Sequence, residues 1–524
     1  MQDLVDLIDF IQKTKFKSNS LLEALIRPDS QLGKMYHAIA KGDALSDRDL
    51  LDLLPELGSL QTVATLRNRL KNRLCDAVFL LDFREENYPD RQVAFVECVK
   101  KWSAAMILIT RNIRSIGIKQ LENLLRHTLE FEFTEISMNI IRTLELYYGT
   151  IEGNQRKFSE LEETLLELEE AWLAERKAER LYCNLVMHYV STRADKYAAS
   201  EKAKEYFAQV QPLMQRHQAF KVHFFGYLIN TVIYDSLHEY DRMELVCLDA
   251  VAFFEGKKYH SGMVQQTFYY NLLTCYLNTR QFEKGLPYFH QLESLVEENS
   301  FNWFKLQELY LMTAMHSEKY REGLSASEKV RSNPSFQSQP SHVQEIWRIF
   351  EAYLFYLMLT GQLPGEEARL SHFRMSRFLN EVPVLSKDKR GMNIAVLIVQ
   401  FLYYAAMRMQ DDCEDRVDAL KKYATRYLND DMTLRNRCFI KMILQIPASS
   451  FDSKLIRKKT QETFAQLQQM PWHTVNQHRE VEVVPYEHLW LIVLRSLEKP
   501  IAVPEIVHAA KPAHGAPVQL PTSR

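Results

Sequence analysis

The residues best suited to catalysis or metal binding are the 16 histidines. Six of them recur through the middle of the chain: His188, His223, His238, His260, His290 and His316. No pair of them combines the spacing of a zinc site with acidic partners. The motifs G-x-x-x-x-G-K-S/T, G-x-G-x-x-G, H-E-x-x-H and G-x-S-x-G are also missing from the sequence. We therefore expect no metal, no cofactor and no catalytic residues.

A second candidate for chemistry is the basic run Arg67, Arg69, Lys71 and Arg73, whose cations could contact nucleic-acid phosphates. The run lies in a predicted helix over about residues 60–83, among leucines spaced four apart. A preceding helix with a capping box at residues 46–49 would permit a helix-turn-helix. The same spacing fits a packed helix whose cations face water. A second basic cluster, Lys454, Arg457, Lys458 and Lys459, has the same two interpretations.

The composition predicts an all-α protein. Only 15 of the 524 residues are Gly, strong helix formers fill most segments, and alternating apolar runs are few. The charge is nearly balanced, with 65 Lys+Arg against 67 Asp+Glu, so no overall basic field recruits nucleic acid. The start of the chain lacks the features of a signal peptide, and the longest apolar stretch, 394–407, is too short to span a bilayer. We expect a soluble cytoplasmic protein without membrane association.

The seven cysteines are scattered and form no C-x-x-C pair. A disulfide framework or a zinc ribbon is therefore not expected. Buried free thiols in a reducing compartment are the prediction.

The clearest structural pattern is a predicted helix pair. Apolar residues recur three or four positions apart over 268–276 and again over 282–296, and residues 278–281 interrupt them. Two helices joined by so short a turn must lie antiparallel and pack on each other. Gly285 lies where the second helix would approach the first, and its missing side chain permits close contact.

This segment resembles the tetratricopeptide repeats. That family has a large residue, Asn-Leu and Tyr in its first helix, and an aromatic, a small residue and another aromatic in its second. The matching places here are Tyr269, Asn271-Leu272, Tyr276, Phe282, Gly285 and Phe289. The segment departs from the family at Leu273, where Gly is usual, and at Glu297, where Pro is common. The resemblance implies a right-handed α-solenoid of antiparallel helix pairs with an extended concave surface.

Similar pairs are predicted on both sides of this one. The residues that would open the second helices are Ile118, Phe158, Tyr197, Tyr240, Phe282 and Tyr320, which are 40, 39, 43, 42 and 38 residues apart. This interval exceeds the tetratricopeptide period of about 34 residues. After Phe158 the pattern predicts an apolar stripe over 161–172 opposite a solvated, glutamate-rich face. A separate first helix is expected around residues 182–189.

The predicted organisation has four regions. Residues 1–90 form an N-terminal helical cap that ends in a linker at 84–90. Residues 91–333 form the tetratricopeptide-like repeats, and 341–498 form further helical repeats with a terminal capping helix at about 485–498. Residues 499–524 carry several prolines and no helical stripe, and we expect them to be disordered.

Three recurrent asparagines are the candidate peptide-binding residues: Asn184, Asn230 and Asn271. They fall in predicted first helices, which line the concave surface of tetratricopeptide proteins. An amide there could hydrogen-bond a bound peptide, although bonding within its own helix pair is the alternative. The basic residues of the family's carboxylate-binding arrangement are not found. By this fold analogy we expect a non-catalytic scaffold or adaptor with a protein or peptide partner.

Two other functions stay open. In the first, residues 1–90 bind nucleic acid through the basic run and the repeats sense a ligand. In the second, an enzyme site assembles across distant repeats, which predicts a deep pocket with clustered titratable groups.

Overall fold

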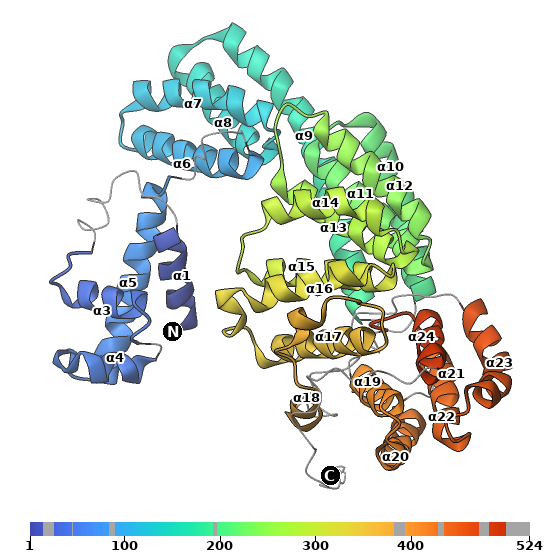
Figure 1. Ribbon diagram of the computed structural model, residues 1–524. Coiled ribbons are helices and arrows are strands. Elements are labelled where there is room, and N and C mark those ends of the chain that lie inside the picture. Colours follow the sequence, from blue (N-terminus) through green and yellow to red (C-terminus); the bar gives the residue numbers. More distant parts are fainter. Residues whose placement is uncertain are drawn as a thin grey trace. The chain divides into compact units, whose positions relative to one another are not determined.

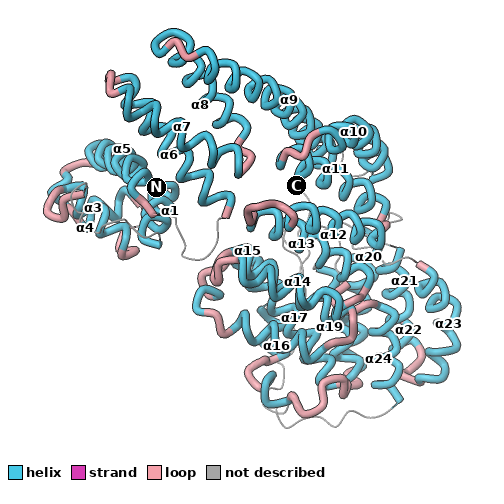
Figure 2. The backbone as a smooth tube through the Cα atoms, turned by 90° about the horizontal axis from the view of Figure 1, so that it is seen from above, coloured by secondary structure: helices cyan, strands magenta, loops and turns pink. Residues whose placement is uncertain are grey.

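The computed structural model describes residues 1–13, 26–44, 46–82, 90–191, 196–381, 393–427, 434–470 and 482–498 (Figure 1). Across these ranges the chain is a helical, repeat-like all-α protein without strands, as Figure 2 shows, so the predicted fold class is confirmed at that level. One isolated bridge pairs Asp90 with His260. The predicted disordered tail and most of the predicted linker lie outside the described residues.

The N-terminal helices share a core of their own. They are α1 Gln2–Lys13, α3 Gln31–Ala40, α4 Asp47–Leu53 and α5 Leu60–Ala77, followed by a 3-10 turn Val78–Leu80. The predicted capping box is confirmed, because Ser46 Oγ accepts from the Asp49 backbone and Asp49 accepts from the Ser46 backbone. Helix α5 ends earlier than predicted. Buried leucines along α5, including Leu66, Leu70 and Leu74, pack with α1 and α3.

Helices follow one another through the middle of the chain. They are α6 Arg91–Thr110, α7 Arg114–Glu130, α8 Thr134–Tyr147, α9 Gln155–Ser191, α10 Lys196–Arg216, α11 Phe220–Leu237, α12 Tyr240–Glu255, α13 Gly262–Thr279, α14 Phe282–Leu295, α15 Phe301–His316 and α16 Tyr320–Arg331. The remaining ones are α17 Ser341–Leu359, α18 Met375–Glu381, α19 Asn393–Ala406, α20 Gln410–Tyr427, α21 Leu434–Ile443, α22 Gln445–Ala448, α23 Ser453–Gln469 and α24 Tyr486–Glu498.

The same backbone turn joins six of the successive helix pairs within the described ranges. Each turn contains one non-glycine residue with left-handed backbone angles: Asn112, Glu132, His238, Arg280, Glu318 and Arg408. The N–H of the following residue donates to the carbonyl five positions earlier, as in Gln281 to Tyr276 and Lys319 to Ala314. This bond satisfies a carbonyl at the end of the first helix. The second helix then begins two residues after the left-handed residue in all six turns.

A small residue at the fourth position of the second helix accompanies five of these turns. These residues are Gly117, Ser137, Gly285, Gly323 and Cys413, whereas α12 has Met243 there. A β-carbon at Gly285 would lie 3.4 Å from Leu273 Cδ2 and from Tyr276 Cβ of α13. The close approach predicted at Gly285 is therefore confirmed. At Gly117 the space is tighter, because a β-carbon would lie 2.6 Å from Ile109 Cγ1 and 2.9 Å from the Ala105 carbonyl oxygen.

The predicted second-helix starts are confirmed most closely at Tyr240, Phe282 and Tyr320, which are the first residues of α12, α14 and α16. The expectation of two helices over 155–191 is wrong. Helix α9 runs unbroken for 37 residues, because no Gly or Pro interrupts the strong helix formers between the two predicted segments.

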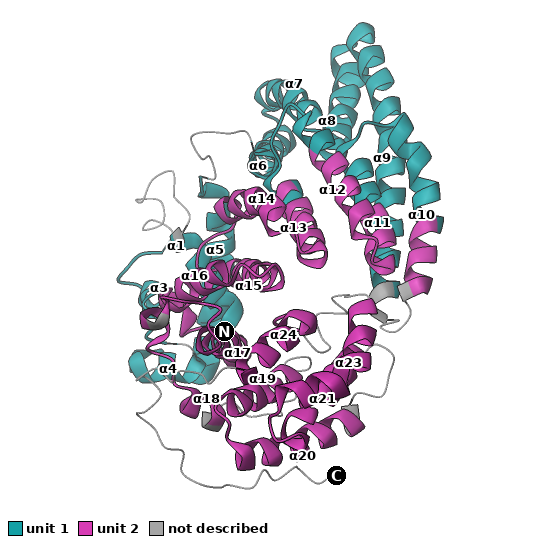
Figure 3. Ribbon diagram, turned by 45° about the vertical axis from the view of Figure 1, so that its right-hand side comes forward, with its two compact units in different colours: residues 1–191, 205–229, 252–264 teal, residues 192–204, 230–251, 265–524 magenta. Residues whose placement is uncertain are grey.

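The chain divides into two compact units (Figure 3). Unit 1 comprises residues 1–191, 205–229 and 252–264. Unit 2 comprises residues 192–204, 230–251 and 265–524. Helices α10 to α13 therefore contribute residues to both units.

Helix α24 of unit 2 carries the predicted apolar stripe, and all five of its residues are buried: Tyr486, Leu489, Trp490, Val493 and Leu497. Ile492 and Leu494 are buried as well, and the helix packs against α19, α21 and α23. Its role as a terminal cap stays a prediction.

Three of the left-handed turn residues contact α24. Arg280 lies 3.7 Å from Glu487, and Glu318 lies 3.5 Å from His488. Arg408 donates to the Leu497 carbonyl at 2.8 Å. Helix α24 thus binds the turns of three different hairpins of unit 2.

Arg435 of α21 anchors the start of α24. Its guanidinium donates to Glu482 at 2.6 and 3.0 Å and to Glu487 at 2.7 Å. It also donates to the carbonyls of Leu467 and Met470 at the end of α23. Only 11% of the Arg435 side chain is exposed, so water stabilises its charge little. The charged forms of Arg435 and its two glutamate partners therefore stabilise one another.

Gly117 and Gly285 occupy equivalent positions in their helix pairs, but replacing them by alanine should change stability differently. Gly117→Ala should lower the local unfolding free energy of α6 and α7 by about 1–3 kcal/mol, because its β-carbon overlaps a backbone oxygen. Gly285→Ala should leave α13 and α14 unchanged or stabilise them by up to about 1 kcal/mol, since 3.4 Å is an ordinary contact and alanine favours helix. Amide hydrogen exchange resolved by segment measures both. Equal destabilisation at the two sites would contradict the packing described here.

Removing the Arg435 guanidinium should loosen α24. Arg435→Ala leaves buried carboxylates without their cation and should destabilise unit 2 by about 3–5 kcal/mol. Arg457→Ala is the matched control, because Arg457 pairs with Glu498 of the same helix at an exposed position and should cost about 1 kcal/mol or less. Denaturant unfolding followed by tryptophan fluorescence compares the two variants. A similar loss in both would remove the anchoring role of Arg435.

Candidate functional site

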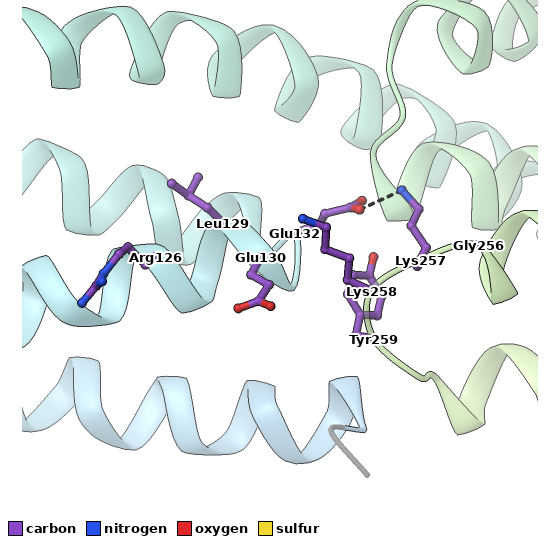
Figure 4. Close-up of a pocket in the computed structure, with 8 residues that line it drawn as sticks. All are labelled: Arg126, Leu129, Glu130, Glu132, Gly256, Lys257, Lys258 and Tyr259. Atoms are coloured by element: carbon purple, nitrogen blue, oxygen red, sulfur yellow. Dashed lines mark hydrogen bonds and ion pairs between the residues drawn. The ribbon is translucent and has the colours of Figure 1, made fainter.

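A hollow of about 520 Å³ opens in unit 1 beside the end of α7 (Figure 4). Its walls come from the last turns of α7, the α7–α8 turn and the α12–α13 loop. The lining residues are Arg126, Leu129, Glu130, Glu132, Gly256, Lys257, Lys258 and Tyr259. Three cations and two carboxylates thus surround a space the size of a small ligand or a short peptide segment.

The turn residue Glu132 and the loop residue Lys257 form the charged pair of this pocket. Lys257 Nζ lies 2.7 Å from Glu132 Oε1, as the dashed line in Figure 4 marks, and it donates to the Gln218 carbonyl at 2.5 Å. The same ammonium lies 4.9 Å from the ring centre of Phe253. Lys257 is therefore held by three partners and is not a mobile surface cation. Arg126, Glu130 and Lys258 are exposed and supply the adjustable charges of the pocket.

Arg91, at the start of α6, holds the α7–α8 turn from beneath. It donates to the carbonyls of Phe131 and Glu132 at 2.9 and 3.0 Å. Its guanidinium lies 3.8 Å from the centre of the Phe220 ring, a cation–π contact. Burial lowers the pKa of Arg91, although nearby Tyr259 and Glu132 favour its charged form.

Asp90, which precedes α6, binds the end of the α12–α13 loop close to the same turn. Its Oδ1 caps α6 by accepting from the Gln92 backbone, and its Oδ2 accepts from the Gly262 backbone at 3.0 Å. His260 Nδ1 lies 3.4 Å from that carboxylate, and the His260 carbonyl accepts from Arg91 N at 2.8 Å. Neighbouring residues of α6 thus fix both the turn and the loop that line the pocket.

Tyr259 is only 5% exposed, and its hydroxyl lies close to Glu132 and Arg91. Burial raises the pKa of this phenol, the Glu132 charge raises it further, and Arg91 opposes the rise.

Behind the turn lies a buried carboxyl group, Glu175 of α9, which is 2% exposed. It accepts from Thr134 Oγ1 at 2.8 Å. Burial raises its pKa from 4.5 to about 7, and the hydrogen bond from Thr134 and the charges of Lys221 and Arg91 oppose that rise.

The structure places the predicted asparagines in two units. Asn184 lies on α9 in unit 1, and Asn230 and Asn271 lie on α11 and α13 in unit 2. All three are half-buried, and none lines the pocket. Among the described residues their amides make no hydrogen bond.

Two of the predicted phosphate-contacting cations are ion-paired. Arg67 donates to both carboxylate oxygens of Asp47 at 2.7 Å, and Lys71 lies 3.2 Å from Asp3. Arg69 and Arg73 are exposed on α5. In the second basic cluster, Lys459 donates to Ser449 and Arg457 pairs with Glu498.

The predicted histidines occupy separate packing positions. His223 stacks on Phe253 with ring centres 3.8 Å apart, and burial lowers its pKa. His316 is fully buried, and its Nε2 lies 2.6 Å from the Glu482 carbonyl oxygen. Burial lowers the pKa of His316 to about 3, so the ring stays neutral. Within the described ranges no group of His, Cys, Asp or Glu side chains could hold a metal ion.

All seven cysteines are free thiols, as predicted, but two of them are exposed rather than buried: Cys75 on α5 and Cys183 on α9. Each lies on the solvent-facing side of a helix whose opposite face makes the core. Among the described helices, none is both long and apolar enough to cross a membrane.

The pocket was not predicted from the sequence. The only local signal was the break Gly256-Lys257-Lys258 between two apolar runs, which marks a loop. The charged partner of that loop, Glu132, is 125 residues away from Lys257. No periodicity within one segment reveals such a contact.

Comparison with protein-family models, with curated proteins and with solved structures gives no match to this chain. The class of protein that the fold defines is therefore the helical, repeat-like all-α class.

Neutralising Glu175 should change how stability depends on pH. The pKa of Glu175 is higher in the folded state, so its stabilising contribution is complete below pH 4.5 and is lost as pH rises through 7. Glu175→Gln keeps the acceptor for Thr134 and removes the charge. At pH 8 the variant should be more stable than the parent by about 3 kcal/mol, and the difference should shrink to about 1 kcal/mol at pH 5. Glu130→Gln, at an exposed position, is the control.

Thermal and denaturant unfolding across pH 5–8 measure this difference. A Glu175→Gln variant that is less stable than the parent at pH 8 would mean that Glu175 acts as a buried anion for Arg91 and Lys221.

Proposed function

We propose that the chain is a tetratricopeptide-like scaffold, a right-handed α-solenoid that binds a protein or peptide partner without catalysis. The recurrence of one hairpin turn in six helix pairs carries this proposal. Tandem repetition of one hairpin builds long ordered surfaces from short local contacts, and such surfaces serve binding in repeat proteins. The free thiols fit a reducing compartment such as the cytoplasm.

The pocket of unit 1 is the place where a charged part of the partner would bind. The exposed residues Arg126, Glu130 and Lys258 of its lining offer charges of both signs. A peptide supplies both carbonyl acceptors and N–H donors, so it suits a pocket of mixed charge. The half-buried amides of Asn184, Asn230 and Asn271 are further candidates for contact with a peptide backbone.

The nucleic-acid regulator is a weaker proposal. Arg67 and Lys71 form ion pairs with Asp47 and Asp3, and these pairs would have to break before the two cations could neutralise phosphates.

Partner capture with two matched charge-reversal variants tests the scaffold. The pocket variant is Arg126→Glu with Lys258→Glu, and the control is Arg69→Glu with Arg73→Glu on α5. In nuclease-treated lysate of the native cells, the parent and the control should recover the same protein, and the pocket variant should lose it by at least about tenfold. Quantitative mass spectrometry of the captured proteins measures the recovery.

Failure to recover a specific protein after nuclease treatment would overturn the scaffold proposal. Recovery of nucleic acid from an untreated lysate that disappears in the Arg69/Arg73 variant would establish the regulator instead. A partner that both variants retain equally would place its contact outside the pocket.

A further inference from the structure

Three exposed apolar residues lie in one row on α9 of unit 1. Leu166, Leu173 and Met187 are 60%, 62% and 61% exposed. They are separated by 7 and 14 residues, and a seven-residue step returns to nearly the same face of a helix. Arg180 occupies the missing step of the row. The opposite side of α9 packs on α8, so this row is the outer face of the helix.

Charges beside the row are ordered along the helix. Glu169 and Glu170 precede Leu173 by four and three residues, and Arg176 and Lys177 follow it by three and four. Glu169 and Arg176 lie on one side of the row, and Glu170 and Lys177 lie on the other, because each pair is seven residues apart. The two acidic residues therefore lie on the N-terminal side of Leu173, and the two basic residues lie on its C-terminal side.

This order is self-complementary under a two-fold rotation. Consider a second α9 that runs antiparallel to the first, with the two Leu173 residues opposite each other. In that register, positions 169 and 170 of one copy lie opposite positions 176 and 177 of the other copy. A two-fold axis brings the same flank of both helices together, so Glu169 meets Arg176 and Glu170 meets Lys177, each twice. In the same register Leu166 lies opposite Arg180, whose aliphatic stem can cover a leucine while its head stays in water.

Within one chain the acidic residues in this region repel one another, and a cationic neighbour would relieve that repulsion. Burial raises the pKa of Glu145 on α8, and the charges of Glu162 and Glu169 raise it further. Two of these charged residues of α9 are ion-paired at exposed positions: Arg176 lies 3.2 Å from Glu179 of the same helix, and Glu170 lies 2.7 Å from Arg216 of α10. Such exposed pairs are weak and exchange readily for pairs across an interface.

We propose that two copies of this chain associate through the outer faces of their α9 helices, antiparallel and centred on Leu173. The occupant of the apolar row is thus the same row of a second copy. This association is independent of the scaffold's partner, because none of its residues lines the pocket of unit 1.

Charge reversal tests the two-fold arrangement with the full chain. One variant carries Glu169→Lys and Glu170→Lys, and the other carries Arg176→Glu and Lys177→Glu. All four substitutions keep strong helix formers, so α9 stays folded. Sedimentation velocity over a concentration series should show self-association of the parent and at least a tenfold weaker association of each variant alone. An equimolar mixture of the two variants should restore association, because the acidic row then meets a basic one.

The apolar centre has its own matched control. Leu173→Glu places two like charges on the two-fold axis and should abolish association. Leu245→Glu changes a leucine of the same exposure, 63%, on α12 and should leave association unchanged. Circular dichroism confirms that each variant retains its helix content.

A parent chain that stays monomeric at high micromolar concentration would overturn the proposal. So would a mixture of the two charge-reversed variants that associates no better than either alone. Loss of association with retained partner capture would leave the proposed scaffold function intact.

Discussion

The structure depends on one backbone constraint, the left-handed residue that ends the first helix of each tight hairpin. A non-glycine residue in this conformation costs about 1–2 kcal/mol. The bond from the next N–H to the carbonyl five residues earlier offsets part of that cost by satisfying a helix end. The turn leaves so little chain between the helices that they must pack side by side. The small residue in the first turn of the second helix then permits close contact, as at Gly285 against Tyr276.

In unit 2, contacts with another helix explain why three of the left-handed residues are not glycine. Glycine would adopt these angles without strain, yet Arg280, Glu318 and Arg408 occupy three of the turns. Each of them contacts α24, which a glycine could not do. One helix thereby holds several hairpins together, and Arg435 anchors its first turn. Local strain is retained where it provides a tertiary contact.

Unit 1 contains the same type of turn, but there the left-handed residue lines a pocket. Glu132 is again a charged left-handed residue, but its partner is Lys257 of the α12–α13 loop. Arg91 secures the turn through backbone carbonyls and secures the loop through its own N–H. The resulting pocket therefore rests on groups whose positions are fixed by several bonds each, which is the condition for selective binding. The exposed row on α9 shares this unit but not these residues.

Sequence patterns alone predicted the all-α fold, the starts of α12, α14 and α16 and the close approach at Gly285, because apolar periodicity and residue size act over a few positions. It also determined the buried stripe of α24, since that stripe is readable from spacing alone. Only the tertiary structure decided that α24 binds three hairpin turns, that Arg67 pairs with Asp47, and that Lys257 reaches Glu132. It likewise left Leu166 and Leu173 exposed on the outer face of α9. These outcomes depend on which faces meet after folding, and that choice is made between segments far apart in the chain, where no local pattern carries information.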